Sequence, residues 1–174
     1  MGAFYQPKKV LIDPTLLQTL APRQISNGLA EAIKVALTSD SVLFEILENR
    51  DLDEALDEII IRSLNVKKDV VEQDEREAGL RRVLNFGHTI GHGIESSGMG
   101  LYHGECVALG MIPMCGEAIR ARVIGVLTRF GLYRALPYDW QEITRAAFHE
   151  KKADGDTVTV ITVDEIGCFA MKPM

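Results

Sequence analysis

Histidines gather in one short stretch of this chain. Three of the four, His88, His92 and His103, lie in the segments Asn85-Phe-Gly-His-Thr-Ile-Gly-His92 and Tyr-His103-Gly-Glu105. A neutral imidazole is the commonest metal ligand among side chains, and it also transfers protons near pH 7. The glycines at positions 87, 91 and 93 let a backbone come close to a ligand. The stretch therefore predicts a metal site, an acid–base site, or both.

Helical spacing predicts which of these side chains share a face. A helix over residues 81–95 separates a polar side (Arg81, Asn85, His88, His92, Glu95) from an apolar side (Val83, Phe86, Ile90, Ile94). An ordinary surface helix shows the same division. Three glycines in one helix, however, cost about 0.5–1 kcal/mol each against alanine. They indicate close approach by a ligand or by a second helix.

The spacing of His88 and His92 also invites comparison with the zinc-protease pattern HExxH. Thr89 stands where that pattern has its glutamate, so the comparison is weak. His103 follows a loop with two glycines and precedes a predicted helix. Glu105 suits the first turn of that helix because of the helix dipole, whereas no structural reason accounts for His103.

Three charged residues lie on predicted helices, and one of them, Lys67, allows two interpretations. Lys67 lies within an apolar stripe of a predicted helix, where it either extends past its neighbours to water or lines a cavity and meets an anion. Glu31 and Lys34 are three residues apart. Taken alone, they predict a solvated ion pair on one helix.

Apolar residues at spacings of three and four predict a mainly α fold. Helices are expected over residues 23–37, 41–47, 52–75, 81–95, 105–124, 127–136 and 140–150, after an extended lead-in over the first 13 residues. The β-branched run 157–163, the turn 164–167 and residues 168–171 predict a small C-terminal β-hairpin. The length of 174 residues predicts a single domain over 1–174.

Composition excludes several classes of protein. A formal net charge of −6 argues against a nucleic-acid partner. No apolar run is long enough for a membrane span, and the N-terminus lacks the pattern of a secretion signal, so we expect a cytoplasmic protein. Cys106, Cys115 and Cys168 form no CxxC pair, which favours reduced thiols.

Six segments together resemble 3-dehydroquinate synthase, in the order found in that family. They are residues 2–8, 11–14, 28–34, 74–81, 84–92 and 103–108. The resemblance covers nearly the whole chain, and implies the multi-helix C-terminal domain of the dehydroquinate synthase-like fold. It also implies a carbon–oxygen lyase acting on phosphates. Such an enzyme converts 3-deoxy-arabino-heptulosonate 7-phosphate to 3-dehydroquinate and phosphate, in the shikimate route to chorismate and the aromatic amino acids.

The resemblance assigns roles residue by residue. Glu31, His88 and His103 resemble the three metal ligands, with zinc as the usual ion and cobalt as another. His92 resembles a substrate contact or proton carrier, and Lys34 an active-site lysine near the metal. Lys67 and Arg81 resemble groups that hold the substrate carboxylate, while Asn85 and one lysine of the pair 151–152, Lys152 by preference, resemble contacts at the phosphate end.

One departure from the family concerns its cofactor. Family members carry a preceding α/β domain that holds most of the NAD site, and this sequence has no strand–glycine–helix fingerprint for a dinucleotide. We expect the N-terminal NAD-binding domain to be absent, and the 174 residues alone to bind metal but complete no redox cycle. The full enzyme is expected to be a homodimer acting on a small sugar phosphate.

Several alternatives remain open. A related sugar-phosphate cyclase, such as 2-deoxy-scyllo-inosose synthase, shares the fold and metal set. The metal-dependent polyol dehydrogenases share the architecture but not the Asn-Phe-Gly-His run. From a different class, the chain could be a non-catalytic metal-binding helical domain.

Overall fold

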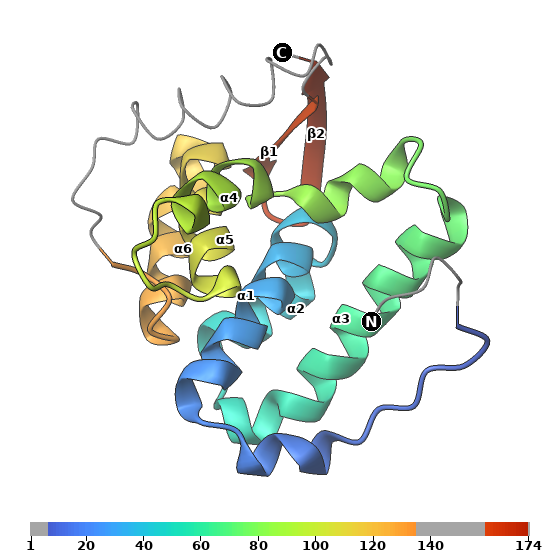
Figure 1. Ribbon diagram of the computed structural model, residues 1–174, viewed down its shortest axis with the longest axis vertical. Coiled ribbons are helices and arrows are strands. Elements are labelled where there is room, and N and C mark those ends of the chain that lie inside the picture. The colour runs from blue at the N-terminus through green and yellow to red at the C-terminus, as the bar shows by residue number, and fades with distance from the viewer. Residues whose placement is uncertain (1–6, 135–158, 174) are drawn as a thin grey trace.

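The computed structural model describes residues 7–134 and 159–173. Within them the chain is mainly helical with one β-hairpin, which confirms the predicted fold class (Figure 1). The elements in chain order are the 3-10 helix η1 (Pro14–Thr19), α1 (Pro22–Ser39), α2 (Ser41–Asn49), α3 (Leu52–Gln73), the 3-10 helix η2 (Leu80–Asn85), α4 (His88–Ser96), α5 (His103–Met111), the 3-10 helix η3 (Ile112–Met114), α6 (Glu117–Arg129), β1 (Thr159–Glu165) and β2 (Cys168–Pro173).

Helix α1 forms the centre of the fold. It starts at Pro22, whose fixed φ suits a first helical turn. It packs against α5, α2 and α3, and in Figure 1 it lies between α3 on one side and the group α4, α5 and α6 on the other. Because neighbours cover it on more than one side, Lys34 is only 4% exposed. The prediction of a solvated pair with Glu31 is therefore wrong for Lys34.

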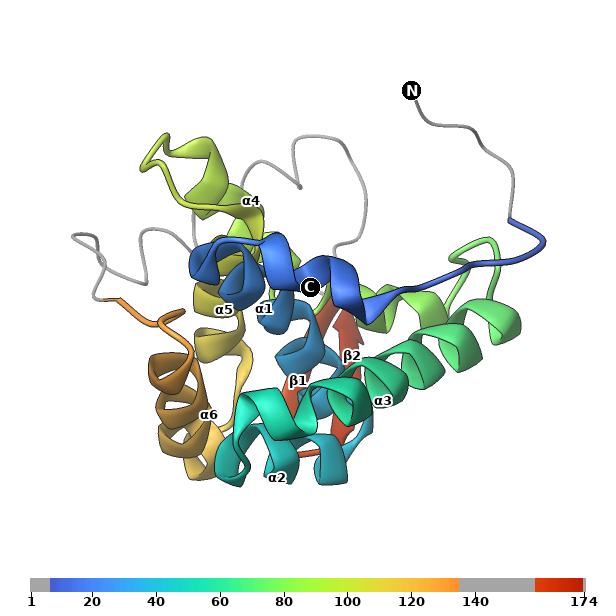
Figure 2. The ribbon, with the colours of Figure 1, turned by 90° about the horizontal axis from the view of Figure 1, so that it is seen from below.

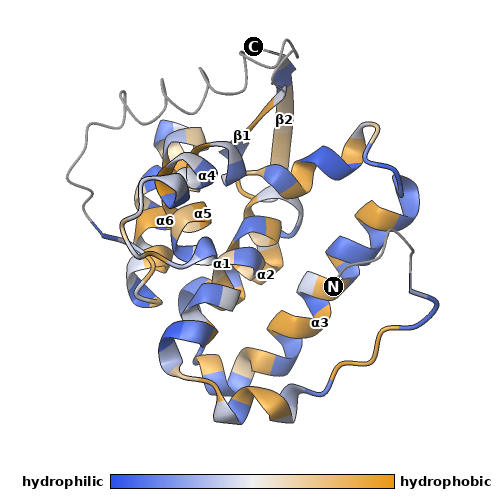
Figure 3. Cartoon of the chain, in the orientation of Figure 1, coloured by the Kyte–Doolittle hydropathy of each residue, from blue (hydrophilic) through white to orange (hydrophobic). Residues whose placement is uncertain are grey.

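The next two helices follow their predicted bounds within two residues. Asp40 caps α2 by accepting the Leu43 N–H at 2.9 Å, and Asp51 caps α3 by accepting the Asp53 N–H at 2.9 Å. Figure 3 shows apolar and polar residues alternating along α3, as expected of a helix with one face on the core.

Two predicted helices are each divided in the structure. The one over 81–95 breaks at Phe86, whose ψ is 128°, and at Gly87, whose φ of 78° is in the left-handed region, so η2 ends at Asn85 and α4 starts at His88. The one over 105–124 breaks at η3, which contains Pro113, and α6 starts at Glu117. The predicted helix over 127–136 is also wrong, since α6 runs on to Arg129 and Gly131 follows with φ 67°. The helix expected over 140–150 lies outside the described residues.

Glycines bring α4 and α5 into backbone contact. A Cβ on Gly91 would lie 3.0 Å from Val107 Cα, and one on Gly110 would lie 2.2 Å from Gly87 O and 2.7 Å from Gly91 N. Of the two explanations predicted for these glycines, a tightly packed second helix is the one that the structure bears out for Gly87 and Gly91.

This packing gives a direct stability prediction. Gly110→Ala should destabilise the fold by about 3 kcal/mol, since the new methyl group would meet backbone atoms that cannot move aside. Gly125→Ala in α6 is the control: nothing lies within 4 Å of its Cβ position, so alanine should stabilise by about 0.5–1 kcal/mol. Urea unfolding of both variants measures this, and equal effects of the two substitutions would contradict it.

The C-terminal hairpin closes one end of the core. β1 and β2 pair antiparallel with Ile161 opposite Met171, which confirms the predicted hairpin. Gly116 donates to Val163 O at 2.8 Å, and Gly167 donates to Leu37 O at 2.8 Å. The hairpin is thereby joined to the start of α6 and to α1.

The lead-in lies on the surface, whereas two of the cysteines are buried. Figure 2 shows the lead-in and η1 crossing one side of the molecule, and Leu11 and Leu16 there are well exposed. Cys106 and Cys115 are buried free thiols, and burial raises their pKa values to about 11 and about 12. Among the described helices, none is both long and apolar enough to cross a membrane.

Candidate metal centre

The three predicted ligands meet where α1, α4 and α5 come together. Glu31 lies in α1, while His88 and His103 are the first residues of α4 and α5. Their ligand atoms all lie within 4.8 Å of one another. His88 Nε2 lies 3.7 Å from Glu31 Oε1, and that buried oxygen has no hydrogen-bond partner in the described structure. A divalent cation would satisfy it, so the donor set fits a metal ion.

Contacts on the far side of each imidazole set its orientation. His88 Nδ1 lies 3.2 Å from Phe86 O, and His103 Nδ1 lies 3.3 Å from Glu95 Oε2. Metal-binding histidines commonly donate the N–H of the second ring nitrogen in this way, which leaves Nε2 free to bind the ion.

Electrostatics favour the charge states that a metal requires. Burial acts to raise the pKa of Glu31, but the nearby ammonium of Lys34, whose Nζ donates to Oε2 at 2.6 Å, holds it below its usual value. Burial and the charge of Lys34 lower the pKa of His88 to about 4. At neutral pH the site therefore presents a carboxylate and a neutral imidazole, both ready to bind a cation.

His92 lies beside these residues on the next turn of α4. Its ring centroid is 5.6 Å from that of His88 and 5.8 Å from that of His103. A second group, His92, Glu95 and His103, also has ligand atoms within 4.8 Å of one another, but all three residues are exposed. The group around Glu31 has the buried, unpartnered donor, and we prefer it for that reason.

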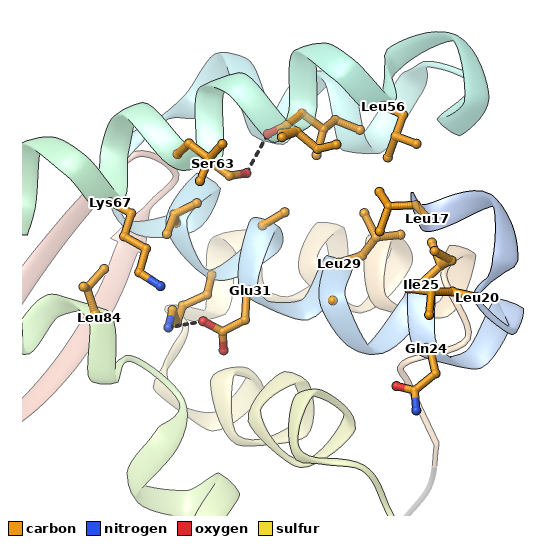
Figure 4. Close-up of a pocket in the computed structure, with 17 residues that line it drawn as sticks. Leu17, Leu20, Gln24, Ile25, Leu29, Glu31, Leu56, Ser63, Lys67 and Leu84 are labelled. Atoms are coloured by element: carbon orange, nitrogen blue, oxygen red, sulfur yellow. Dashed lines mark hydrogen bonds and ion pairs between the residues drawn. The ribbon is translucent and has the colours of Figure 1, made fainter. Parts of the chain in front are cut away.

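A cavity of about 430 Å³ opens beside Glu31, between α1, α3 and η1. Its wall is largely apolar, with Glu31, Lys34 and Lys67 as its charged residues. Figure 4 shows the Lys67 side chain extending from α3 toward Glu31. Burial lowers the pKa of Lys34. Lys67 thus lines a cavity, as the functional interpretation of its position requires.

Two of the remaining predicted site residues lie outside α1, α4 and α5, in the 3-10 helix η2. Arg81 and Asn85 lie in η2, before the break at Gly87, and not on the same helix as His88. The Arg81 guanidinium donates to Glu75 O at 2.7 Å, and the Asn85 amide donates to Glu77 Oε1 at 2.7 Å. The single polar stripe predicted over 81–95 is therefore wrong. Lys152 lies outside the described residues.

Asp74 folds the segment that carries Arg81. Its carboxylate accepts the backbone N–H groups of Ala78, Gly79 and Arg81 at 2.8, 2.8 and 2.9 Å, and the bonds from Arg81 and Gly79 lower its pKa. These three hydrogen bonds fold the Asp74–Arg81 motif into a turn.

Sequence reasoning missed two residues near these groups. Glu77 has φ 58°, a left-handed conformation that is uncommon outside glycine, and its side chain holds Asn85. No pattern in the sequence predicts that backbone conformation. Glu95 was placed on the polar face of the predicted helix without a role, although its spacing of three from His92 is visible in the sequence.

Fold and site together define a class: a helical domain with a candidate divalent-metal centre beside a cavity that carries two lysines. The chain belongs to the 3-dehydroquinate synthase family, since the family model "3-dehydroquinate synthase C-terminal" matches residues 28–153. A 3-dehydroquinate synthase of Streptococcus thermophilus is 39% identical over 98% of this chain, which confirms the resemblance seen in the motifs. The chain spans about half the length of that relative, 53%.

Solved structures show the same fold. The 2-epi-5-epi-valiolone synthase of Streptomyces hygroscopicus, with NAD+ and Zn2+ bound, matches all of this chain and 54% of its own, with 27% identity and a TM-score of 0.84. A 2-deoxy-scyllo-inosose synthase with carbaglucose-6-phosphate, NAD+ and Co2+ matches all of this chain and 54% of its own, with 26% identity and a TM-score of 0.78. The chain is thus similar to metal-containing, NAD-containing cyclases.

Proposed function

We propose that this chain is the metal- and substrate-binding part of a 3-dehydroquinate synthase. That enzyme converts 3-deoxy-arabino-heptulosonate 7-phosphate to 3-dehydroquinate and phosphate. The observation that carries the proposal is the meeting of Glu31, His88 and His103 beside a cavity with two lysines, in a chain of this family. NAD would be held mainly by a domain corresponding to the other half of the relatives. The assignment to the cytoplasm and the homodimer remain predictions.

The residues would divide the work between the metal and the substrate. A divalent ion, zinc or cobalt as in the two neighbours, would act as a Lewis acid toward a substrate hydroxyl at this centre. Glu31, His88 and His103 would hold it and leave a position open for the substrate. Lys34 keeps the Glu31 carboxylate ionised and in place.

The polar residues around the centre would bind and protonate the substrate. Lys67, with Arg81, would meet the substrate carboxylate, while Asn85 and Lys152 would meet the phosphate end. Because Arg81 and Asn85 now bond to the Glu75 carbonyl and to Glu77, these contacts require them to exchange partners. His92 would carry a proton or contact the phosphate.

A chimera tests the proposal. Residues 1–174 joined to the N-terminal half of the Streptococcus thermophilus relative should form dehydroquinate when supplied with NAD and zinc, and the 174 residues alone should not. The same chimera carrying His88→Ala is the control for activity that does not depend on the metal.

The same assay separates the alternatives. Turnover of glucose 6-phosphate, of which the neighbour's carbaglucose-6-phosphate is an analogue, would favour a 2-deoxy-scyllo-inosose synthase. A chimera that binds NAD and metal but turns over neither substrate would favour a non-catalytic domain. The higher identity to 3-dehydroquinate synthase, 39% against 26%, favours the first function.

Lys67 gives a binding prediction. A charge-assisted hydrogen bond contributes roughly 1.5–3 kcal/mol, so Lys67→Met should weaken binding of a carboxylate-bearing substrate analogue by about 10- to 100-fold. The fold should be unchanged or slightly more stable, because methionine joins an apolar wall. Calorimetric titration of the metal-loaded chimera measures the change.

Lys68→Met is the matched control for Lys67→Met. Lys68 is exposed and pairs with Glu72 at 3.8 Å, and it does not line the cavity. Its loss should leave the affinity as it was. Equal effects from the two substitutions would show that Lys67 acts only through the general charge of α3.

A further inference from the structure

One face of α1 contacts three consecutive residues at the start of α5. Arg23, Asn27 and Glu31 are spaced by four, so they lie above one another on the helix. They meet Glu105, Gly104 and His103, respectively, in the reverse order along the chain. The innermost of the three contacts is the candidate metal centre.

The outermost contact is a bidentate ion pair between Arg23 and Glu105. Arg23 Nε donates to Glu105 Oε1 at 2.8 Å, and Nη2 donates to Oε2 at 2.7 Å. Glu105 is only 5% exposed, and its Oε2 also accepts the Tyr102 N–H at 2.8 Å. The guanidinium lies over the Tyr102 ring at 4.1 Å and donates to Gly100 O at 3.2 Å. Arg23 therefore fixes the backbone on both sides of His103.

The middle contact brings the two helices together. Asn27 Oδ1 accepts the Gly104 N–H at 2.7 Å. A Cβ on Gly104 would lie 2.1 Å from Asn27 O, so only glycine allows this approach. The N–H of a first helical turn has no partner within its own helix, and Asn27 supplies that partner from α1.

His103 itself has few contacts that could hold it. Within the described residues, its side chain is 45% exposed and makes a polar contact with Glu95, which is 43% exposed, beside the rings of His88 and His92. Its position relative to Glu31 therefore depends on the backbone of its neighbours, and α1 holds that backbone.

We infer that Arg23 and Asn27 are positioning residues of the metal centre, acting on His103 through Glu105 and Gly104. The inference rests on the proposed function, because it requires that Glu31, His88 and His103 bind an ion. Helix α1 then supplies one ligand directly and fixes the place of a second.

Cobalt binding tests the inference without reference to turnover. The 174-residue chain is loaded with Co2+, and its visible absorption and the rate of cobalt release to a chelator are recorded. Loss of a residue that orients a ligand commonly weakens metal affinity by about 10- to 100-fold. Arg23→Met and Asn27→Leu should each release cobalt faster by about that factor and shift the absorption bands. Asn27→Asp, which keeps an acceptor for the Gly104 N–H, should restore both properties.

Arg122→Met is the matched control. Arg122 in α6 makes an equivalent bidentate ion pair with Glu48 in α2, at 2.9 and 2.6 Å. Its guanidinium also lies over an aromatic ring, that of Phe44. Its loss should leave cobalt release and absorption unchanged. If Arg23→Met fails to fold, Arg23→Lys keeps a cation beside the buried Glu105 and should still release cobalt faster than the wild type.

The outcomes separate this inference from the proposed function. Variants of Arg23 and Asn27 that bind cobalt with the wild-type spectrum and release rate would overturn the positioning role alone. A wild-type chain that takes up no cobalt would overturn the metal centre, and the positioning role with it.

Discussion

Replacing either His88 or His103 with alanine should remove the bound divalent ion. A structural zinc site contributes about 10–16 kcal/mol through four ligands, or roughly 3 kcal/mol for each. The loss of one ligand should therefore weaken affinity by at least about 100-fold. Glu31→Gln should act in the same direction, because it removes the only carboxylate of the group and leaves Lys34 without its partner.

Metal analysis of the purified chains measures the effect. Each variant is dialysed against a weak chelator. Its zinc content is then compared with that of the wild type, for variants whose folded state is as stable as the wild type's. Full zinc content in both histidine variants would show that the ion lies elsewhere. Zinc that survives Glu31→Gln but not His103→Ala would point to the exposed group of His92, Glu95 and His103.

Replacing His92 should separate turnover from metal binding. His92 shares α4 with His88 but does not belong to the group with the buried Glu31 oxygen. His92→Ala should keep its metal. A positioned acid–base group contributes about 10²- to 10⁴-fold to a rate, so kcat of the chimera should fall by that factor.

A metal titration and a rate measurement on one preparation decide this. Loss of metal from His92→Ala, with retention in His103→Ala, would establish the i, i+4 histidine pair as the ligand set. Retained metal and retained turnover would reduce His92 to a neighbour of the site.

The long amphipathic helices could be predicted, and their interruptions could not. α1, α2 and α3 follow the apolar period closely because each presents one continuous stripe to the core. The same period runs through Phe86 and Gly87, where a ψ of 128° and a φ of 78° break the helix. A periodicity of side chains carries no information about such a local backbone angle. Pro113, in contrast, is a sequence signal for the second break, because proline disfavours a helix interior.

The site was predictable to the extent that its residues lie in short motifs. The family resemblance predicts Glu31, His88 and His103 as metal ligands, and the structure brings these candidate ligands together. The burial of Lys34 was not visible in its spacing from Glu31, because it depends on α3 and α5 covering α1 from different sides. The role inferred for Arg23 depends on a contact across 82 residues, which a single sequence does not reveal.

The backbone contact between α4 and α5 bears on which ions this centre can accept. His88 and His103 each open one of these helices, and the glycines leave the helices no room to approach further. The gap between the two imidazoles is therefore stiff. Ca2+ takes six to eight oxygen ligands at about 2.3–2.6 Å, whereas Zn2+ and Co2+ accept nitrogen donors at shorter range in a low-coordinate site. The donor type is set by the two imidazoles and the carboxylate, whereas selection by ionic size follows from the main chain that spaces the imidazoles, and changes in the surrounding core side chains should leave that spacing intact.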